Sequence, residues 1–318
     1  MIRTLGKITA LQRFAFALRP LTVRLITALL AAVTLAGCLA HHQGAMPGEP
    51  KAASFHVIDG VRVRYRDVGQ GPVVVLIHGF ASSLETWSLV EPELIKDHRL
   101  ISLDLKGFGW TDRPEGDYSP DAQARIVLGL LDQLGIDKAA VVAHSWGCSV
   151  ALALALRAPT RVTRLALYDA WAYDQQIPAF FRWAMVPGLG EALFALYYDE
   201  RPEDRLVLAF FDPSRVPQKL LDDVVFSLKR PGTTAAALAA VRGERFAAMQ
   251  GRYRQIAAPT LLLWGRQDGV ALEEFAERLV RDMPDVRVRW FERCGHFPML
   301  EAVAESNRAL GQFLREGR

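Results

Sequence analysis

Three residues whose side-chain types can together perform acyl transfer each follow a strand-like segment in this 318-residue chain: Ser145, Asp268 and His296. A serine hydroxyl is a weak nucleophile until an imidazole removes its proton, and a carboxylate can orient that imidazole and stabilise its cation. Because the carboxyl ends of parallel strands meet at one edge of a sheet, the three side chains can meet there. The sequence therefore predicts a hydrogen-bonded triad of Ser145, His296 and Asp268.

The segment around Ser145 reads AHSWG at 143–147, between a β-branched run and an Ala/Leu-rich helical pattern. A strand, a tight turn and a helix in succession hold the serine hydroxyl out at the edge of a sheet. Such a turn needs small residues on both sides, and here they are Ala143 and Gly147. The pentapeptide alone is equally compatible with an ordinary strand-to-helix turn, so the elements around it decide between the two interpretations.

A second acidic residue competes with Asp268 for the third position of the triad. Asp169 also follows a strand-like run, residues 162–168. Asp268 comes directly after the run at 259–264, and His296 lies one further strand along the chain. We choose Asp268 because its context is W-G-R-x-D and because the order Ser, Asp, His then follows three successive strand ends.

The turn at 143–147 and the order Ser145, Asp268, His296 resemble those of the α/β-hydrolase superfamily, specifically its serine hydrolases with a helical cap. The resemblance covers about residues 55–316 and is specific for the fold and the triad, but not for the substrate. It implies an acyl-enzyme mechanism with no metal and no organic cofactor.

The same resemblance assigns an oxyanion hole to two backbone N–H groups, those of Phe80 and Trp146. Phe80 belongs to the segment His78-Gly79-Phe80, which follows an apolar run at 72–77. We expect Gly79 and Gly147 to support this site and His78 to shape the loop. His78 could also serve as a base, but His296 is better placed for that role.

The surrounding sequence predicts a mostly parallel sheet flanked by helices. Strand-like and helical patterns alternate through residues 54–170 and again through 257–318, after a hairpin centred on Asp59-Gly60. Between them, residues 171–256 show helical periodicity interrupted by prolines, which predicts an all-helical cap over Ser145. Its aromatic residues either form a small core or line a pocket; they include Trp171, Tyr173, Phe180, Phe181, Trp183, Phe194, Tyr197 and Tyr198.

A serine nucleophile limits the reactions that this fold can perform. Relatives that open epoxides or remove halides use aspartate at this position, because water must be able to open the intermediate. The expected substrate is a carboxylic ester, or a related acyl compound such as a thioester, lactone or amide, with a small apolar acyl or aryl group. C–C hydrolysis of dienone acids, perhydrolase or haloperoxidase chemistry, and a non-catalytic lipoprotein of the same fold remain alternatives.

The first 37 residues resemble a bacterial lipoprotein signal peptide. Basic residues precede the apolar run at 25–36, which is short for a membrane span. It ends in Leu-Ala-Gly-Cys at 35–38, so we expect Cys38 to be acylated and residues 38–53 to form a flexible tether. Leu39 favours anchoring to the outer membrane, facing the periplasm; an inner-membrane signal anchor and a soluble periplasmic protein are the alternatives.

The charge distribution gives no support for a nucleic-acid partner. The formal charge is +3, but five basic residues and no acidic residue precede position 38. The rest of the chain carries 33 basic and 35 acidic residues and is therefore close to neutral.

Two cysteines remain if Cys38 is acylated. Cys148 and Cys294 lie three residues after the serine and two before the histidine. We expect two buried thiols rather than a disulfide, because the geometry of a disulfide is demanding.

Overall fold

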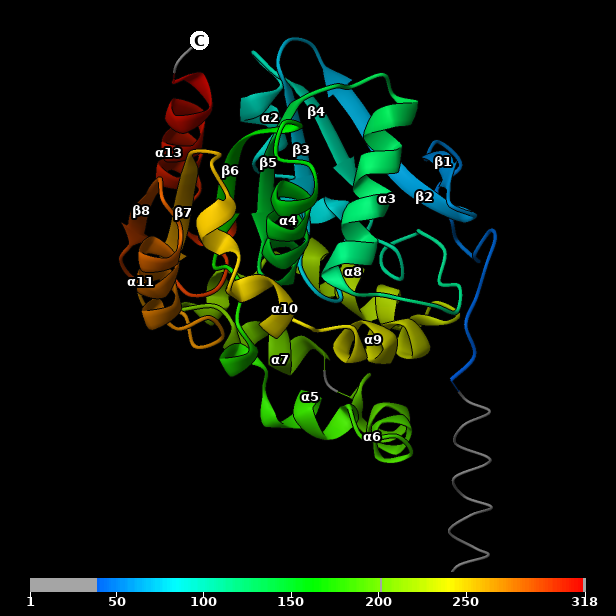
Figure 1. Cartoon of the computed structure of the whole chain (residues 1–318). Coiled ribbons are helices and arrows are strands. Elements are labelled where there is room, and N and C mark those ends of the chain that lie inside the picture. Colours follow the sequence, from blue (N-terminus) through cyan, green and yellow to red (C-terminus); the bar gives the residue numbers. More distant parts are fainter. Residues whose placement is uncertain (1–38, 201, 317–318) are drawn as a thin grey trace, which may run out of the picture.

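The computed structural model describes residues 39–200 and 202–316. Its centre is an eight-stranded sheet in the order β1-β2-β4-β3-β5-β6-β7-β8 (Figure 1). β2 is antiparallel to both of its neighbours, and all other pairs are parallel, which confirms the predicted sheet. The strands are β1 (Ser54–Ile58), β2 (Val61–Gly69), β3 (Val73–Ile77), β4 (Arg99–Leu103), β5 (Ala139–His144), β6 (Val162–Tyr168), β7 (Thr260–Gly265) and β8 (Val286–Phe291).

Helices cover both faces of this sheet. Successive residues of β3 alternate between two apolar clusters: Val75 packs with α3 and α4 on one face, and Leu76 packs with α2 and α13 on the other. This explains why the central strands read as continuous apolar runs. The helices of the two layers are α2 (Glu91–Leu94), α3 (Pro120–Gln133), α4 (Trp146–Arg157), α11 (Glu273–Asp282), α12 (Pro298–Glu301) and α13 (Val303–Arg315).

The hairpin between β1 and β2 turns through two residues with positive φ. Asp59 has a φ of 49° and Gly60 has a φ of 77°. Two positive φ angles match the twist of the flanking strands, and Asp-Gly adopts them at low cost. The predicted hairpin is confirmed.

The residues between β6 and β7 form the helical insertion (residues 171–256), which contains no strand in its described part. In Figure 1 its helices lie below the sheet, and several of them line the same cavity as Ser145. They are α5 (Ala179–Ala184), α6 (Leu189–Tyr197), α7 (Pro202–Leu208), α8 (Gln218–Leu228), α9 (Thr233–Arg242) and α10 (Ala247–Gln250).

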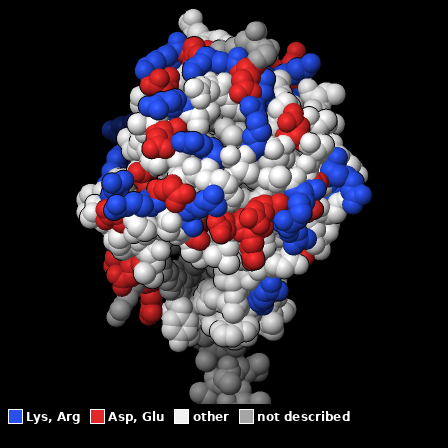
Figure 2. Space-filling model, turned by 90° about the vertical axis from the view of Figure 1, so that its left-hand side faces the viewer, with Lys and Arg blue, Asp and Glu red and all other residues white. Residues whose placement is uncertain are grey.

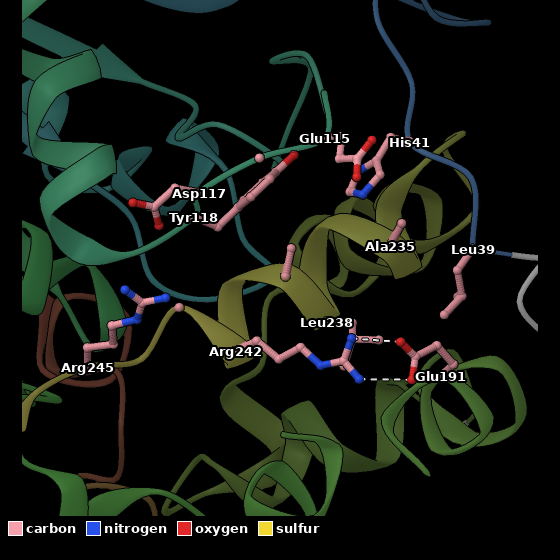
Figure 3. Close-up of a pocket in the computed structure, with 13 residues that line it drawn as sticks. Leu39, His41, Glu115, Asp117, Tyr118, Glu191, Ala235, Leu238, Arg242 and Arg245 are labelled. Atoms are coloured by element: carbon pink, nitrogen blue, oxygen red, sulfur yellow. Dashed lines mark hydrogen bonds and ion pairs between the residues drawn. The ribbon is translucent and has the colours of Figure 1, made fainter. Parts of the chain in front are cut away.

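Residues 39–53, here called the N-terminal strap, lie against the body of the protein, although the sequence predicted a flexible tether. His42 and Arg113 exchange two backbone hydrogen bonds of 2.9 and 2.7 Å. Met46 is buried, and Glu49 forms a bidentate ion pair with Arg62. The strap is therefore held at several points along its length. Figure 3 shows its first residues, Leu39 and His41, beside helices of the insertion.

The predicted signal peptide (1–37) and its acylated Cys38 lie outside the described residues. Within the described part of the chain, every helix is too short or too polar to cross a bilayer.

Candidate active site

Ser145 stands at a strained turn between β5 and α4. Its φ of 52° and ψ of −124° are unusual for a residue with a side chain. Strain of this kind persists only where the surroundings enforce it. Here the Ser145 N–H donates to the carbonyl of Tyr168, and the Ser145 carbonyl accepts from Trp171 and Cys148. The turn therefore fixes the serine at the carboxyl edge of the sheet and at the N-terminus of a 12-residue helix.

The structure brings the three predicted triad residues together. His296 Nε2 lies 2.9 Å from Ser145 Oγ, and His296 Nδ1 lies 2.7 Å from Asp268 Oδ2. All three residues are buried. The other oxygen of Asp268 accepts the N–H groups of Val270 and Ala271 at 2.7 and 3.0 Å. With both oxygens engaged, the Asp268 carboxylate can orient the imidazole for proton transfer from Ser145.

The competing acid, Asp169, takes a different position. Its Oδ1 accepts the Gly265 N–H at 2.9 Å, and its Oδ2 has no hydrogen-bond partner among the described residues. Burial, and then the charge of Asp268, raise the pKa of Asp169 well above its usual range. His296 Nδ1 is hydrogen-bonded to Asp268, whereas the hydrogen-bonded oxygen of Asp169 accepts a backbone N–H, so the geometry favours Asp268 as the acid.

The segment His78-Gly79-Phe80 faces the serine turn. His78 Nδ1 donates to the Gly79 carbonyl at 2.7 Å, and His78 Nε2 accepts the Leu105 N–H at 3.0 Å. Burial lowers the pKa of His78, so the ring is neutral. Both ring nitrogens are thus occupied by backbone groups, which is the geometry of a loop-shaping residue.

The two amides predicted as oxyanion donors belong to Phe80 and Trp146. Neither amide donates a hydrogen bond to an acceptor in the described part of the chain. Phe80 lines the cavity at Ser145, and Trp146 is the first residue of α4, whose N-terminal dipole favours negative charge. Two unpaired donors flanking the serine are what a developing oxyanion requires.

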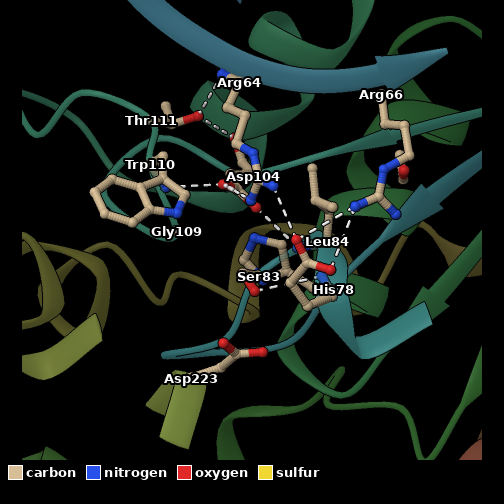
Figure 4. A network of polar contacts seen from close by, with 12 residues as sticks. Arg64, Arg66, His78, Ser83, Leu84, Asp104, Gly109, Trp110, Thr111 and Asp223 are labelled. Atoms are coloured by element: carbon tan, nitrogen blue, oxygen red, sulfur yellow. Dashed lines mark hydrogen bonds and ion pairs between the residues drawn. The ribbon is translucent and has the colours of Figure 1, made fainter. Parts of the chain in front are cut away.

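A buried polar network holds the loops behind this site (Figure 4). Asp104 follows β4 and accepts the N–H groups of Leu84 and Trp110, both at 2.8 Å. Its Oδ2 also accepts from Arg64 Nη1 at 3.3 Å. The carboxylate therefore ties the loop after β4 to the segment that follows residues 78–80.

Gly147 is the small residue on the C-terminal side of the turn, and the surrounding backbone leaves no room for a side chain there. A Cβ on Gly147 would lie 2.3 Å from the backbone carbonyl oxygen of His78. Gly79 is also confined, because its Cβ would lie 3.1 Å from that of Ser145. The two backbones can approach this closely only without side chains.

We therefore expect Gly147→Ala to damage both stability and turnover. Overpacking against the His78 carbonyl should lower the free energy of unfolding by about 1–3 kcal/mol. Displacing the Trp146 amide should lower kcat by roughly 10²-fold, the effect of losing one oxyanion donor. Denaturant unfolding and ester hydrolysis measure the two effects. Gly251→Ala is the matched control, because a Cβ there meets nothing within 4 Å; equal effects of the two variants would contradict the explanation.

A cavity of about 570 Å³ opens at Ser145, and the insertion contributes eight of its sixteen lining residues, most of them apolar. The sequence could not tell which aromatic residues of the insertion line a pocket. Phe180, Phe181 and Tyr198 line the cavity, whereas Trp183 and Tyr197 are exposed. The remaining lining residues are Gly79, Phe80, Ala81, Ser82, His144, Ser145, Leu206, Ala209, Leu220, Val224, Leu228, His296 and Phe297.

His144 is a site residue that sequence reasoning missed. Its Nε2 donates to the His296 carbonyl at 2.8 Å, which fixes the backbone of the proposed base. Burial lowers the pKa of His144 well below its usual value, so the ring is neutral. The only available signal was its place directly before the serine in the turn.

His144, Asp169 and His296 also place one potential metal ligand each within 4.8 Å of one another. Both ring nitrogens of His296 are engaged by Ser145 and Asp268. A metal ion at this point would have to displace the hydrogen bonds that join His296 to Ser145 and Asp268, so the donor set does not suit one.

Both remaining cysteines, Cys148 and Cys294, are free and buried, as expected. Burial raises the pKa of each thiol, so neither is an activated nucleophile.

Known proteins resemble this chain in sequence and in fold. Residues 72–303 match the family model described as alpha/beta hydrolase fold. The chain is 32% identical to 2-hydroxy-6-oxo-2,4-heptadienoate hydrolase from Pseudomonas putida, over 80% of this chain and 93% of that protein. It is 30% identical to 2-hydroxymuconate semialdehyde hydrolase from Pseudomonas sp., over 84% and 95%.

The solved structure of a meta-cleavage product hydrolase from Pseudomonas fluorescens superposes with a TM-score of 0.72 and 29% identity, covering 83% of this chain and 98% of that one. The family model, the relatives and the fold lead to one conclusion: the chain belongs to the alpha/beta hydrolase family.

Proposed function

We propose that the protein is a serine hydrolase that cleaves uncharged carboxylic esters with an apolar acyl or aryl group. The observation that carries the proposal is the hydrogen-bonded line from Asp268 through His296 to Ser145, with Ser145 at an apolar cavity. The nucleophile Ser145 is within hydrogen-bond distance of its base, His296, and His296 is within hydrogen-bond distance of Asp268, the acid that orients it.

In the proposed mechanism His296 Nε2 takes the proton of Ser145 Oγ as the oxygen attacks the ester carbonyl. The negative charge on the carbonyl oxygen is stabilised by the N–H groups of Phe80 and Trp146, donors that are typically worth about 3–4 kcal/mol each. His296 then returns its proton to the leaving alcohol. Water activated by His296 hydrolyses the acyl-enzyme, and Asp268 stabilises the imidazolium in both steps.

The charge of the cavity favours an ester over a dienone acid. The relatives named above act on carboxylate-bearing dienoates, by their names. A buried carboxylate needs a cationic or hydrogen-bonding partner. The described lining of the cavity includes no lysine or arginine. Arg182 of α5 donates instead to the carbonyls of Ile177 and Asp174, and Arg230 stacks on Trp110 and donates to the Gly109 carbonyl.

C–C hydrolysis is the second candidate, and the identity of 30–32% to such hydrolases favours it. Perhydrolase or haloperoxidase chemistry and a non-catalytic role stay predictions with no observation in their favour.

A substrate series separates the two candidates. Hydrolysis of p-nitrophenyl esters of increasing acyl length would be measured beside a 2-hydroxy-6-oxo-dienoate under the same conditions. We expect kcat/KM to rise with acyl length until the cavity is filled, because each buried methylene contributes about 0.8 kcal/mol. The dienoate should react more slowly than the best ester. A dienoate that reacts faster than every ester would favour C–C hydrolysis.

A further inference from the structure

The outer surface of helices α5 and α6 is unusually apolar. It exposes five large side chains, each 45–58% accessible: Trp183, Val186, Leu189, Leu196 and Tyr197. We call these residues the α5–α6 surface. Among the described residues, eight of the fourteen exposed large hydrophobic side chains belong to the helical insertion. Such a concentration on one element indicates a surface that meets an apolar partner.

Charge is almost absent from this surface. Between residues 179 and 197 the ionisable acidic and basic residues are Arg182 and Glu191. Arg182 donates to backbone carbonyls, and Glu191 pairs with Arg242 of α9 (Figure 3). Figure 2 shows that charged side chains are dense over the upper part of that face of the molecule and sparser at its lower end, where the insertion lies. The five residues of the α5–α6 surface are therefore uncharged, and the exposed Arg182 beside them keeps its hydrogen bonds to backbone carbonyls.

The first described residue of the chain lies against helices α5 and α6. Leu39, the first described residue, packs against an apolar cluster that contains Ala184 of α5 and Phe194 of α6. Cys38, the predicted acylation site, is its neighbour in the chain, and consecutive Cα atoms are about 3.8 Å apart. The apolar run at 25–36 precedes it closely. A membrane that holds this part of the chain would lie next to α5 and α6.

The same helices also border the cavity. Phe180 and Phe181 of α5 line the space at Ser145, while Trp183 of the same helix faces outward. One short helix thus separates the proposed substrate site from the exposed apolar surface. An apolar ester, which partitions into lipid, would meet the protein on this side.

We propose that the α5–α6 surface docks on an uncharged lipid bilayer and that apolar ester substrates enter the cavity from the bilayer. Trp183 and Tyr197 are the residue types that prefer the membrane–water interface. Asp199 and Glu200 follow α6 at its exposed end and would repel anionic headgroups, so the bilayer is zwitterionic. Membrane docking rests on the exposed surface and the chain path, whereas the entry of esters also rests on the proposed function.

Quenching by brominated lipids tests the docking. The full chain would be reconstituted in phosphatidylcholine vesicles, with or without bromine on the upper acyl carbons. We expect brominated lipid to quench the tryptophan emission, and Trp183→Phe to remove most of that quenching. Trp290→Phe is the matched control, because Trp290 lies on β8 beneath Arg266, far along the sheet from β5.

Three results would overturn the docking: a full chain that does not associate with the vesicles, no quenching in the associated protein, or equal quenching in wild type and Trp183→Phe. If the surface instead binds a second copy of the chain, the protein in detergent should dimerise, and Trp183→Glu should abolish the dimer. The quenching needs no turnover, so its failure is distinct from failure of the ester hydrolase proposal.

A pair of charge substitutions tests the entry of substrate. Leu196→Glu places a charge on the α5–α6 surface, and Val280→Glu places one on the exposed side of α11. We expect both variants to hydrolyse a water-soluble short-chain ester at the wild-type rate. On a long-chain ester held in vesicles, Leu196→Glu should lose at least about tenfold in rate, the cost of bringing one charge to the membrane, and Val280→Glu should lose little. Equal rates for the two variants on the vesicle substrate would contradict bilayer entry.

Discussion

Replacing Ser145 with alanine is expected to lower kcat for a chromogenic ester by about 10⁶-fold, the loss seen when a serine hydrolase loses its nucleophile. Residual turnover should remain above the rate in water, because the oxyanion donors and the cavity are intact. The large loss in kcat follows from the geometry: His296 Nε2 lies 2.9 Å from Ser145 Oγ, and alanine has no oxygen that could attack the ester carbonyl. Steady-state kinetics with a burst assay would measure the loss.

Ser149 provides the matched control for this substitution. It lies on the same helix, is equally buried, and its hydroxyl donates to the Trp146 carbonyl at 2.6 Å. Ser149→Ala should cost about 1 kcal/mol of stability through the lost hydrogen bond and change kcat less than tenfold. A kcat of Ser145→Ala that stays within about tenfold of the wild-type value, as expected for Ser149→Ala, would place the nucleophile elsewhere.

The second large effect distinguishes the two acids near His296. Asp268→Asn should lower kcat by about 10⁴-fold, because an amide at this position neither stabilises the imidazolium nor favours the correct tautomer. Asp169→Asn should lower kcat less than tenfold. The asparagine oxygen can still accept the Gly265 N–H, and an amide is close in shape to the protonated carboxyl that burial favours at Asp169.

Comparing the losses in kcat of these two variants identifies the acid that orients His296, whichever variant loses more. If Asp169→Asn caused the larger loss, the acid would follow β6 rather than β7, and the hydrogen bond between His296 and Asp268 would be structural. Circular dichroism of both variants would check that the fold is unchanged. Each residue is buried, so unfolding must be excluded before the kinetics are compared.

The sequence was sufficient for the fold and for the positions of the candidate triad because both depend on local patterns. Buried parallel strands read as apolar runs, and Ser145 and Asp268 lie just beyond two of them. His296 follows β8, whose sequence VRVRWF alternates as expected for a half-buried strand at the edge of the sheet. Once the alternation of strands and helices indicates a parallel sheet, the ends of those strands must converge.

The sequence was insufficient where contacts are long-range. The N-terminal strap has the composition of a linker, yet it is held by Arg62, Asp112 and Arg113, which lie far from it in the chain. Nothing in residues 39–53 alone reports these partners. The inward or outward direction of the insertion's aromatics was equally hidden, since short helices broken by prolines give too few turns for a periodic pattern.

The most direct measurement is the site of covalent reaction with a fluorophosphonate. The reagent phosphonylates a serine, with loss of fluoride, only when an adjacent base activates the hydroxyl and an oxyanion hole receives the phosphoryl oxygen. We predict one adduct per chain, located by peptide mass spectrometry on the peptide that contains Ser145, and its loss in His296→Ala. A folded protein that forms no adduct, or one that is labelled only at another residue, would contradict the account.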